Sequence, residues 1–401
     1  MYISILMTVF SPYLAVLPLL YLFFRLVKER EWGVWNRNAW TQGLFILFLW
    51  SFLVGLSDEN NSWSALASIV LLLFLAASIY IQDHYQTVEK VEKLFSSLFF
   101  LSFGSAFVGL LENWNVITYS PAWWKFLLGT RSIVEIEESH RIAGTFNNPN
   151  LAGTWYAVMV LVGFYFFQRN KNYKKYIYLA GMVLYISVLS MTESRAAVIG
   201  CFLGFVFYTY FAGHKRKMLF LMSSLLIGTA LMLLRPEWFP RGEILFSSIN
   251  DRQAIWENCF HMFMIKPITG WGLLGIYYAD PEVYNYLRVF HAHNLWLTIA
   301  TTLGIIGLGI FMWMKWSLLQ EIRRLYEHKC PLTPLLCGVI GMIFGQGLFD
   351  FTIMSPQIGI LLIACWSFIY SLSHSYRSVA SPSLVPWTNA YTTKKTLPKA
   401  P

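Results

Sequence analysis

Charged side chains are scarce in this sequence of 401 residues: only 13% are charged, whereas 56% are hydrophobic. A soluble globular domain carries about 25% charged residues, so the composition excludes an ordinary soluble domain. The chain also lacks a Walker loop and a GxGxxG turn after a strand, which excludes the common nucleotide-binding sites. These absences favour a protein that lies mostly in lipid.

Cysteine is also sparse. The five cysteines are scattered, only Cys259 falls in a loop expected outside the membrane, and no CxxC pair occurs. This spacing excludes a disulfide framework and a cysteine-based metal site. No other metal-ligand cluster is visible, so we expect neither a metal nor a cofactor.

Long apolar runs dominate what the sequence does contain. A helix needs about 20 apolar residues to cross the hydrocarbon layer, which is roughly 30 Å thick. Runs that meet or approach this length begin near Ile3, Trp40, Trp63, Leu94, Leu151, Tyr176, Ala196, Met218, Asn294, Thr333 and Met354. The sequence therefore predicts an all-α polytopic membrane protein with about eleven transmembrane helices.

The first run, from Ile3 to Val27, has a signal peptide as its alternative. It lacks a basic leader and a small-residue cleavage site, and Arg25 and Lys28 lie at its end. We therefore expect a retained first span.

The net charge of +9 has an uneven distribution along the chain. When the loops are taken alternately, one set contains 21 of the 30 basic residues, and the other contains 14 of the 21 acidic residues. Because Lys and Arg concentrate on the cytoplasmic side, the first set is expected to face inward. This places the N-terminus outside and the C-terminus inside. The positive charge then reflects membrane topology and predicts no nucleic-acid partner.

Two of the expected outer loops are long, at residues 112–150 and 235–293. The first contains "PAWWKFLLG", whose aromatic rings suit headgroup depth. The second contains "NDRQAIWENCFHMFMI", where apolar residues recur at helical spacing behind Asn250 or Asp251 as a cap. We predict an amphipathic helix on the outer surface there, followed by irregular backbone in "KPITGWGLLGIYYADPEVY".

Three arginines lie at predicted helix ends on the outer side. Arg195 stands in the short turn "TESR" between two spans, where an unpaired charge is costly, and pairing with Glu193 is the simple alternative. Arg141 precedes "GTFNNPN", where Asn148 or Asn150 can cap the next helix. Arg252 falls in the expected first turn of a helix, where the dipole disfavours a cation. A solvated loop position is its alternative.

Two histidines, His291 and His293, precede the apolar run "NLWLTIATTLGIIG". A histidine at such a helix mouth is commonly a hydrogen-bonded cap. Because histidine titrates near neutral pH, it is also a possible general base. These residues alone do not decide between the two histidines.

Taken together, "RIAGTFNNPNLAG", "SRAA", "DRQAIW…ITGWGLLG" and "HAHNLWLTIATTLGIIG" resemble the O-antigen ligase and polymerase superfamily of bacterial membrane glycosyltransferases. The resemblance covers roughly residues 141–351. The family's histidine motif, His-Asn followed nine residues later by Gly-x-x-Gly, matches His293, Asn294, Gly304 and Gly307. The family usually has about twelve spans with both termini inside. The eleven spans and the outside N-terminus expected for this chain differ from that pattern.

The resemblance implies a function. In this family a glycan moves from a polyprenyl-pyrophosphate donor to an acceptor hydroxyl at the outer face of the cytoplasmic membrane. It implies His293 as base, Arg195 and Arg252 as pyrophosphate ligands with Arg141 as a weaker third, and supporting roles for Asn294 and His291. The acceptor is a sugar-bearing lipid, polymer or protein, and ligase and polymerase remain equal alternatives.

The implied domains are N-terminal helices at 1–111, a catalytic membrane domain at 112–372 and a disordered cytoplasmic tail at 373–401. A rival interpretation is a transporter of a small anion or a flippase for lipid-linked sugars. Transporters usually carry charged or broken-helix sites near the midplane, whereas these spans are nearly free of charge and the arginines gather at one face.

Overall fold

A computed structural model of the chain describes residues 2–29, 35–57, 63–117 and 141–380, and every regular element among them is a helix. Each of the eleven predicted runs contains a helix. Seven helices are long and apolar enough to cross a membrane, at Ala39–Leu56, Trp63–His84, Val88–Asn113, Pro149–Arg169, Lys215–Leu234, Leu295–Glu327 and Pro356–Arg377. Two shorter apolar helices are α10 (Arg195–Phe211) and α15 (Thr333–Gln346). The predicted all-α polytopic class is confirmed, and the number of crossings stays a prediction.

The predicted first span is wrong as a single helix. The structure divides it into α1 (Tyr2–Phe10) and α2 (Val16–Glu29). Between them lies Pro12, which has no backbone N–H to donate and disrupts a helix interior. The Ser11 hydroxyl accepts from the backbone N–H groups of Tyr13 and Leu14, 3.2 Å away in each case, and so supports the turn. After this break α1 packs on α6 (Val88–Asn113), and α2 packs on α5 (Ile69–His84).

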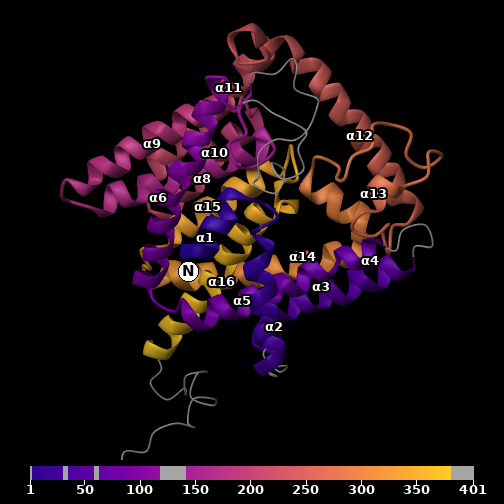
Figure 1. Cartoon of the computed structure of the whole chain (residues 1–401), viewed down its shortest axis with the longest axis horizontal. Coiled ribbons are helices and arrows are strands. Elements are labelled where there is room, and N and C mark those ends of the chain that lie inside the picture. The colour runs from indigo at the N-terminus through magenta and orange to yellow at the C-terminus, as the bar shows by residue number, and fades with distance from the viewer. Residues whose placement is uncertain (1, 30–34, 58–62, 118–140, 381–401) are drawn as a thin grey trace, which may run out of the picture.

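The interior is formed by α8 (Pro149–Arg169) and α16 (Pro356–Ala380), whose buried side chains contact most of the other helices. Figure 1 shows α16 passing through the middle of the molecule, with α5 and α15 beside it. Next to α8 lie α9 (Lys174–Met191) and α10, and α10 packs against α15. Glycines permit this close approach, because a Cβ on Gly200 would lie 2.9 Å from the Met342 carbonyl oxygen.

The C-terminal helix α16 runs to Ala380, past the predicted boundary at residue 372. The start of the predicted tail is therefore helical. Residues 381–401 lie outside the described part of the chain, as do "PAWWKFLLG" and the rest of 118–140.

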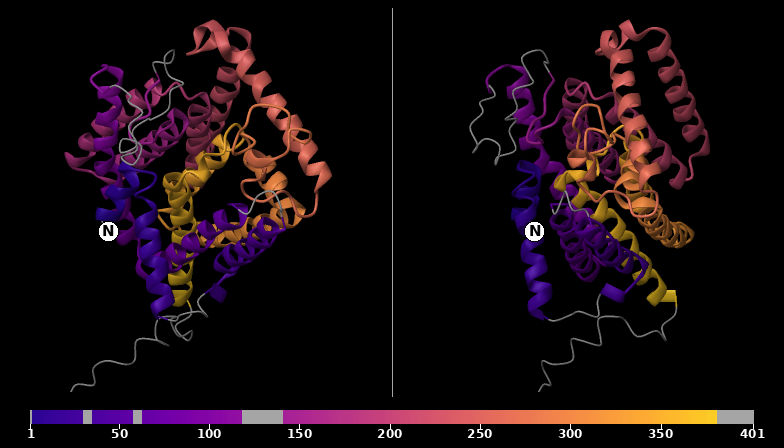
Figure 2. Two further views of the ribbon diagram at one scale, coloured as in Figure 1. Left: turned by 45° about the vertical axis from the view of Figure 1, so that its right-hand side comes forward. Right: turned by 90° about the vertical axis from the view of Figure 1, so that its right-hand side faces the viewer.

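The predicted amphipathic helix is present as α12, but it begins earlier than expected. It spans Leu245–Ile265 after two short 3₁₀ turns, η2 (Pro236–Trp238) and η3 (Gly242–Ile244). Asp251 is therefore in the helix interior and accepts from the Tyr286 hydroxyl, so its predicted capping role is wrong. Arg252 likewise lies beyond the first turn, which removes the dipole argument made for it. Figures 1 and 2 show α12 at the periphery, on the side away from the N-terminus.

The irregular segment that follows α12 is as expected, apart from the short helix α13 (Gly275–Tyr278). It inserts beside a kink in α14 (Leu295–Glu327), where Gly304 has φ 65°. The Ile305 N–H donates to the Pro267 carbonyl at 2.8 Å, and a Cβ on Gly304 would lie 2.1 Å from the Ile268 carbonyl oxygen. Gly304 thus admits the backbone of the loop that follows α12.

The remaining described helices are α3 (Ala39–Leu56), which packs on α14 and α5, the short α4 (Trp63–Ala67) and α11 (Lys215–Leu234). A 3₁₀ turn, η4 (Thr352–Met354), precedes α16. The loop between α15 and α16 begins beside the start of α14, where the Leu295 N–H donates to the Gly347 carbonyl at 2.7 Å, and this brings two distant parts of the chain together.

Candidate active site

The α15–α16 loop places Asp350 next to His293. The distance from His293 Nδ1 to Asp350 Oδ1 is 3.1 Å. The Asp350 side chain is only 6% exposed, whereas that of His293 is 28% exposed. The pair therefore has a buried carboxylate and a histidine that remains accessible from one side.

Asp350 is held in its ionised form. Burial raises its pKa, but the hydrogen bond with His293, the electrostatic interaction with the two histidines and the Phe351 N–H outweigh that effect and hold the pKa well below its usual range. Its second oxygen, Oδ2, accepts from Asn150 Nδ2 at 2.9 Å. An ionised carboxylate only accepts hydrogen bonds, so the Nδ1 of His293 must carry the proton of that bond. The Nε2 of a neutral His293 then presents a lone pair.

His291 supports the backbone of His293. The backbone N–H of His293 donates to the Nδ1 of His291 at 3.2 Å. The centroids of the two rings are 4.5 Å apart, and the ring planes are inclined by 70°. His293 has φ 49°, in the left-handed region where side chains other than glycine are uncommon. Burial lowers the pKa of His291 to about 4, against the opposing effect of the Asp350 carboxylate. The neutral ring keeps one proton, and because Nδ1 accepts from the His293 N–H, that proton is on Nε2.

Asn294 caps α14. Its side-chain oxygen accepts from the Leu297 N–H at 3.0 Å, and its amide donates to the Leu348 carbonyl at 3.1 Å. The ring of His293 is contacted by Asp350, whereas Asn294 contacts backbone atoms. The cap fastens the start of α14 to the loop that carries Asp350, so it sets the distance between the paired residues.

Arg141 braces this arrangement from another loop. Its Nε donates to the Thr192 carbonyl at 2.8 Å, and its Nη2 donates to Asn150 Oδ1 at 2.9 Å. The same Asn150 side chain donates to Asp350 through its amide. Of the two asparagines proposed as caps, Asn148 accepts from the Asn150 N–H and begins α8. Arg141 thus acts on Asp350 through Asn150.

Arg195 and Arg252 belong to a second cluster, which also includes Arg241. Arg195 is the first residue of α10, and its Nη1 donates to the Arg241 carbonyl at 3.4 Å. The positive charges of Arg241 and Arg252 act against that of Arg195. Among the described residues Arg195 makes no ion pair with Glu193, so the simple alternative is not observed there. Three like charges brought together form a site suited to an anion.

Arg252 interacts electrostatically both with Arg241 of the arginine cluster and with Asp350, the partner of His293. The pKa of Arg252 is lowered, chiefly by burial and further by the charge of Arg241. The nearby Asp350 carboxylate opposes this shift. The Nη1 of Arg252 donates weakly to Ser248 Oγ at 3.4 Å. This partly buried guanidinium makes one weak hydrogen bond to a described side chain and lies near Asp350 and Arg241, so its donors suit a bidentate anion.

Sequence reasoning missed three residues of this site. Asp350 is a lone charge between two apolar runs, and the argument applied to Arg195 was sufficient to find it. Asn150 was noted only as a cap. Arg241 carries no signal in the sequence, because its proximity to Arg195 depends on the path of the loop through η2 and η3.

Three potential metal ligands meet here. Nitrogen or oxygen atoms of His291, His293 and Asp350 lie within 4.8 Å of one another, which is close enough for a metal ion. However, His293 Nδ1 is bonded to Asp350, and His291 Nδ1 accepts from the backbone. Ligation through these atoms would require both bonds to break. The absence of a required metal stays a prediction.

These features define a class: a polytopic helical membrane protein with a histidine–aspartate pair beside an arginine cluster. Residues 180–312 match the family model described as O-antigen ligase, a range that includes Arg195, Arg252 and His293 but not Asp350. With the relatives below, this match supports the similarity to the O-antigen ligase superfamily that the sequence motifs indicated.

The similar proteins come from several bacteria. A protein of Rickettsia typhi described as a candidate polysaccharide ligase is 29% identical over 210 residues, 47% of this chain and 50% of that protein. The exopolysaccharide production protein ExoQ of Rhizobium meliloti is 26% identical over 189 residues, 42% of this chain and 43% of its own. The teichuronic acid biosynthesis protein TuaE of Bacillus subtilis is 23% identical over 374 residues, 86% of this chain and 74% of its own. The chain thus spans about half the length of the Rickettsia relative.

Proposed function

We propose that this protein is a membrane glycosyltransferase that moves a glycan from a polyprenyl-pyrophosphate donor to an acceptor hydroxyl at the outer face of the bacterial cytoplasmic membrane. The observation that carries the proposal is the contact of His293 with Asp350 beside the cluster of Arg195, Arg241 and Arg252. The similarity to proteins named for polysaccharide ligation, exopolysaccharide production and teichuronic acid synthesis supports the same class of substrate.

In this mechanism His293 acts as the general base. Asp350 keeps the proton on Nδ1, so Nε2 accepts the proton of the attacking hydroxyl. Asp350 also stabilises the imidazolium that then forms, in the manner of the carboxylate of a catalytic triad. The ring's remaining exposure leaves a route for an acceptor that arrives from the aqueous side.

The arginines stabilise the leaving group. As the acceptor oxygen bonds to the anomeric carbon, the bond from that carbon to the pyrophosphate oxygen breaks, and the electron pair stays on the pyrophosphate. The negative charge developing there meets guanidinium forks, which bind such oxygens bidentately. The proton taken by His293 is later released to water. Direct attack inverts the configuration of the transferred sugar, and no metal is needed in this scheme.

The test is a transfer assay with purified protein and a defined polyprenyl-pyrophosphate oligosaccharide. His293→Ala should lower the rate by roughly 10²–10⁴-fold while donor affinity stays nearly unchanged. Normal transfer by His293→Ala, or a defect wholly due to lost donor binding, would make the histidine a structural cap. The products of the same assay, a capped acceptor or a lengthened lipid-linked chain, separate ligase from polymerase.

A further inference from the structure

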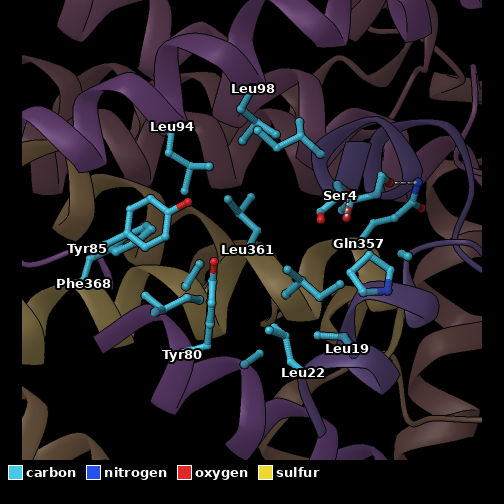
Figure 3. A pocket seen from close by; sticks show the side chains of 18 of the residues that line it. Ser4, Leu19, Leu22, Tyr80, Tyr85, Leu94, Leu98, Gln357, Leu361 and Phe368 are labelled. Atoms are coloured by element: carbon cyan, nitrogen blue, oxygen red, sulfur yellow. Dashed lines mark hydrogen bonds between the residues drawn. The ribbon is translucent and has the colours of Figure 1, made fainter. Parts of the chain in front are cut away.

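A cavity of about 280 Å³ lies among the N-terminal helices, apart from the arginine and histidine residues of the candidate site. Its walls come from α1, α2, α5, α6 and α16, with one residue, Trp155, from α8. Figure 3 shows Leu361 of α16 near the middle, Leu94 and Leu98 on one side, and Leu19 and Leu22 on the other. The cavity is therefore part of the membrane-embedded region of the chain.

The broken first span explains why this space is open. Because the chain turns at Pro12, α1 packs on α6 while α2 packs on α5. A continuous first helix could not contact both partners in this way. Residues of both short helices, of α6 and of α16 line the space that remains between them.

The interior of the cavity suits a hydrocarbon chain. Most of its lining is aliphatic or aromatic, and the amide of Gln357 at one end is turned to the Thr8 carbonyl, 2.9 Å away. With few polar partners available, ordered water is disfavoured there. The volume is just below the range of roughly 300–1,000 Å³ typical of small-molecule pockets, so it fits a single chain and no bulky headgroup.

Two tyrosines bring hydroxyl groups to the other end of the cavity. The hydroxyls of Tyr80 and Tyr85 both point inward in Figure 3. Tyrosine is common at the level of lipid headgroups, where its ring is in hydrocarbon and its hydroxyl meets polar groups. These hydroxyls are suited to donate to ester carbonyls at the start of an acyl chain.

Basic residues surround that same end. Arg25 lies one helical turn beyond Tyr21 in α2, and Tyr21 lines the cavity. Lys28 lies seven residues beyond Tyr21, on the same face of α2. On the opposite wall Lys90 lies one helical turn before Leu94, in the first turn of α6, where the helix dipole adds positive potential.

Three acidic groups near this rim are already paired, and Glu89 stands beside Lys90 in the first turn of α6. Glu29 pairs with Arg25, Glu92 with Arg169, and Asp83 with Arg37. Lys28 and Lys90 are exposed, and neither forms an ion pair with another residue in the described ranges. Their charges are available to an external anion.

We propose that this cavity holds one acyl chain of an anionic phospholipid, whose headgroup lies against the basic ends of α2 and α6. Basic pockets between transmembrane helices are suited to anionic headgroups. The hydrocarbon chain fills the space left by the helix break, and the tyrosine hydroxyls meet its ester group. The bound lipid would fasten α2 to α6, which make no extensive contact of their own.

The experiment measures lipid binding to the purified full-length protein by native mass spectrometry. The probes are phosphatidylglycerol, phosphatidylcholine with the same chains, and polyprenyl phosphate. We expect phosphatidylglycerol to bind preferentially and to raise the temperature of thermal unfolding. The double variant Lys28→Glu, Lys90→Glu should weaken that binding by on the order of ten-fold or more, since each surface charge contributes measurably to anionic-lipid affinity. The control Lys171→Glu, Lys217→Glu, at exposed sites outside the cavity, should bind like the unmodified protein.

A second pair of measurements locates the lipid. Phosphatidylglycerol with a diazirine on its acyl chain should crosslink to peptides of α2, α6 and α16. Ala364→Leu, which fills the cavity, should reduce that crosslinking. If the Ala364 variant fails to fold, the lysine variants and the crosslink map still test whether the lipid occupies the cavity. Equal binding of phosphatidylcholine, preference for polyprenyl phosphate, unaltered binding by the lysine double variant, or crosslinks confined to other helices would each overturn the proposal. None of these outcomes depends on glycan transfer.

Discussion

The backbone N–H of His293 donates to the Nδ1 of His291, 3.2 Å away, and this bond holds His293 in a left-handed conformation that orients its side chain toward Asp350. A histidine that accepts through Nδ1 must lack a proton there. The pKa of about 4 that burial gives His291 meets this requirement at neutral pH.

The first prediction concerns acid pH. The pKa of His291 is lowered in the folded state from its ordinary value of about 6.5. The unfolded chain therefore binds more protons between about pH 6.5 and pH 4, and stability should fall as the pH falls through that window. His291→Asn offers a non-titrating acceptor, so it should retain activity and show a flatter dependence of unfolding temperature on pH. An unchanged pH dependence in this variant would exclude His291 as the cause.

The second prediction concerns Asp350. Asp350→Asn keeps the size but removes the charge that selects the Nδ1–H tautomer of His293. The transfer rate should drop by roughly 10²–10⁴-fold, with donor affinity little changed. Asp280→Asn is the matched control, because Asp280 is an exposed aspartate in the separate loop between α13 and α14. Near-normal turnover of Asp350→Asn would mean that the carboxylate does not orient the base.

The third prediction concerns the arginine fork. Arg195→Lys and Arg252→Lys keep the charge but lose bidentate geometry, and each should cost on the order of 2–4 kcal/mol in transition-state stabilisation. That corresponds to a decrease of tens- to hundreds-fold or more in kcat/KM for the lipid-linked donor. Arg235→Lys is the control, since Arg235 is exposed and paired with Glu237 at 3.7 Å. If both test variants turned over at the full rate, the pyrophosphate role would be wrong.

The fourth prediction is metal independence. Because the Nδ1 atoms of His291 and His293 already make hydrogen bonds, transfer should survive removal of divalent ions by a chelator. The measurement is the transfer rate before and after chelation and gel filtration. Loss of activity that zinc or another divalent ion restores would instead identify the cluster of histidines and Asp350 as a metal site.

The fifth prediction concerns orientation in the membrane. A cysteine at exposed Asn285 should react with an impermeant thiol reagent in intact cells, and one at exposed Asn172 should react only after permeabilisation. Four of the native cysteines are buried, and Cys201 is only partly exposed, so background labelling should be low. Labelling of Asn172→Cys in intact cells would reverse the topology and move the candidate site to the cytoplasmic side.

Much of the architecture was determined by the sequence itself, because hydropathy and helix length are local properties. The eleven apolar runs each contain a helix, and the arginines and histidines at their ends were identifiable as rare charges next to apolar spans. The family motif selected His293 over His291. The broken first span was also foreseeable in part, since Pro12 is visible in the run.

Only the tertiary structure decided how these residues meet. His293 and Asp350 are 57 positions apart, and their contact depends on α15 returning the chain to the start of α14. Arg241 joins Arg195 because two short turns set its backbone, and Gly304 kinks α14 around the 267–272 backbone. Such contacts between distant segments arise from packing, which a pattern of hydropathy along one chain does not encode. The sequence alone therefore gave the residue types of the site, and folding in three dimensions selected which of them face one another.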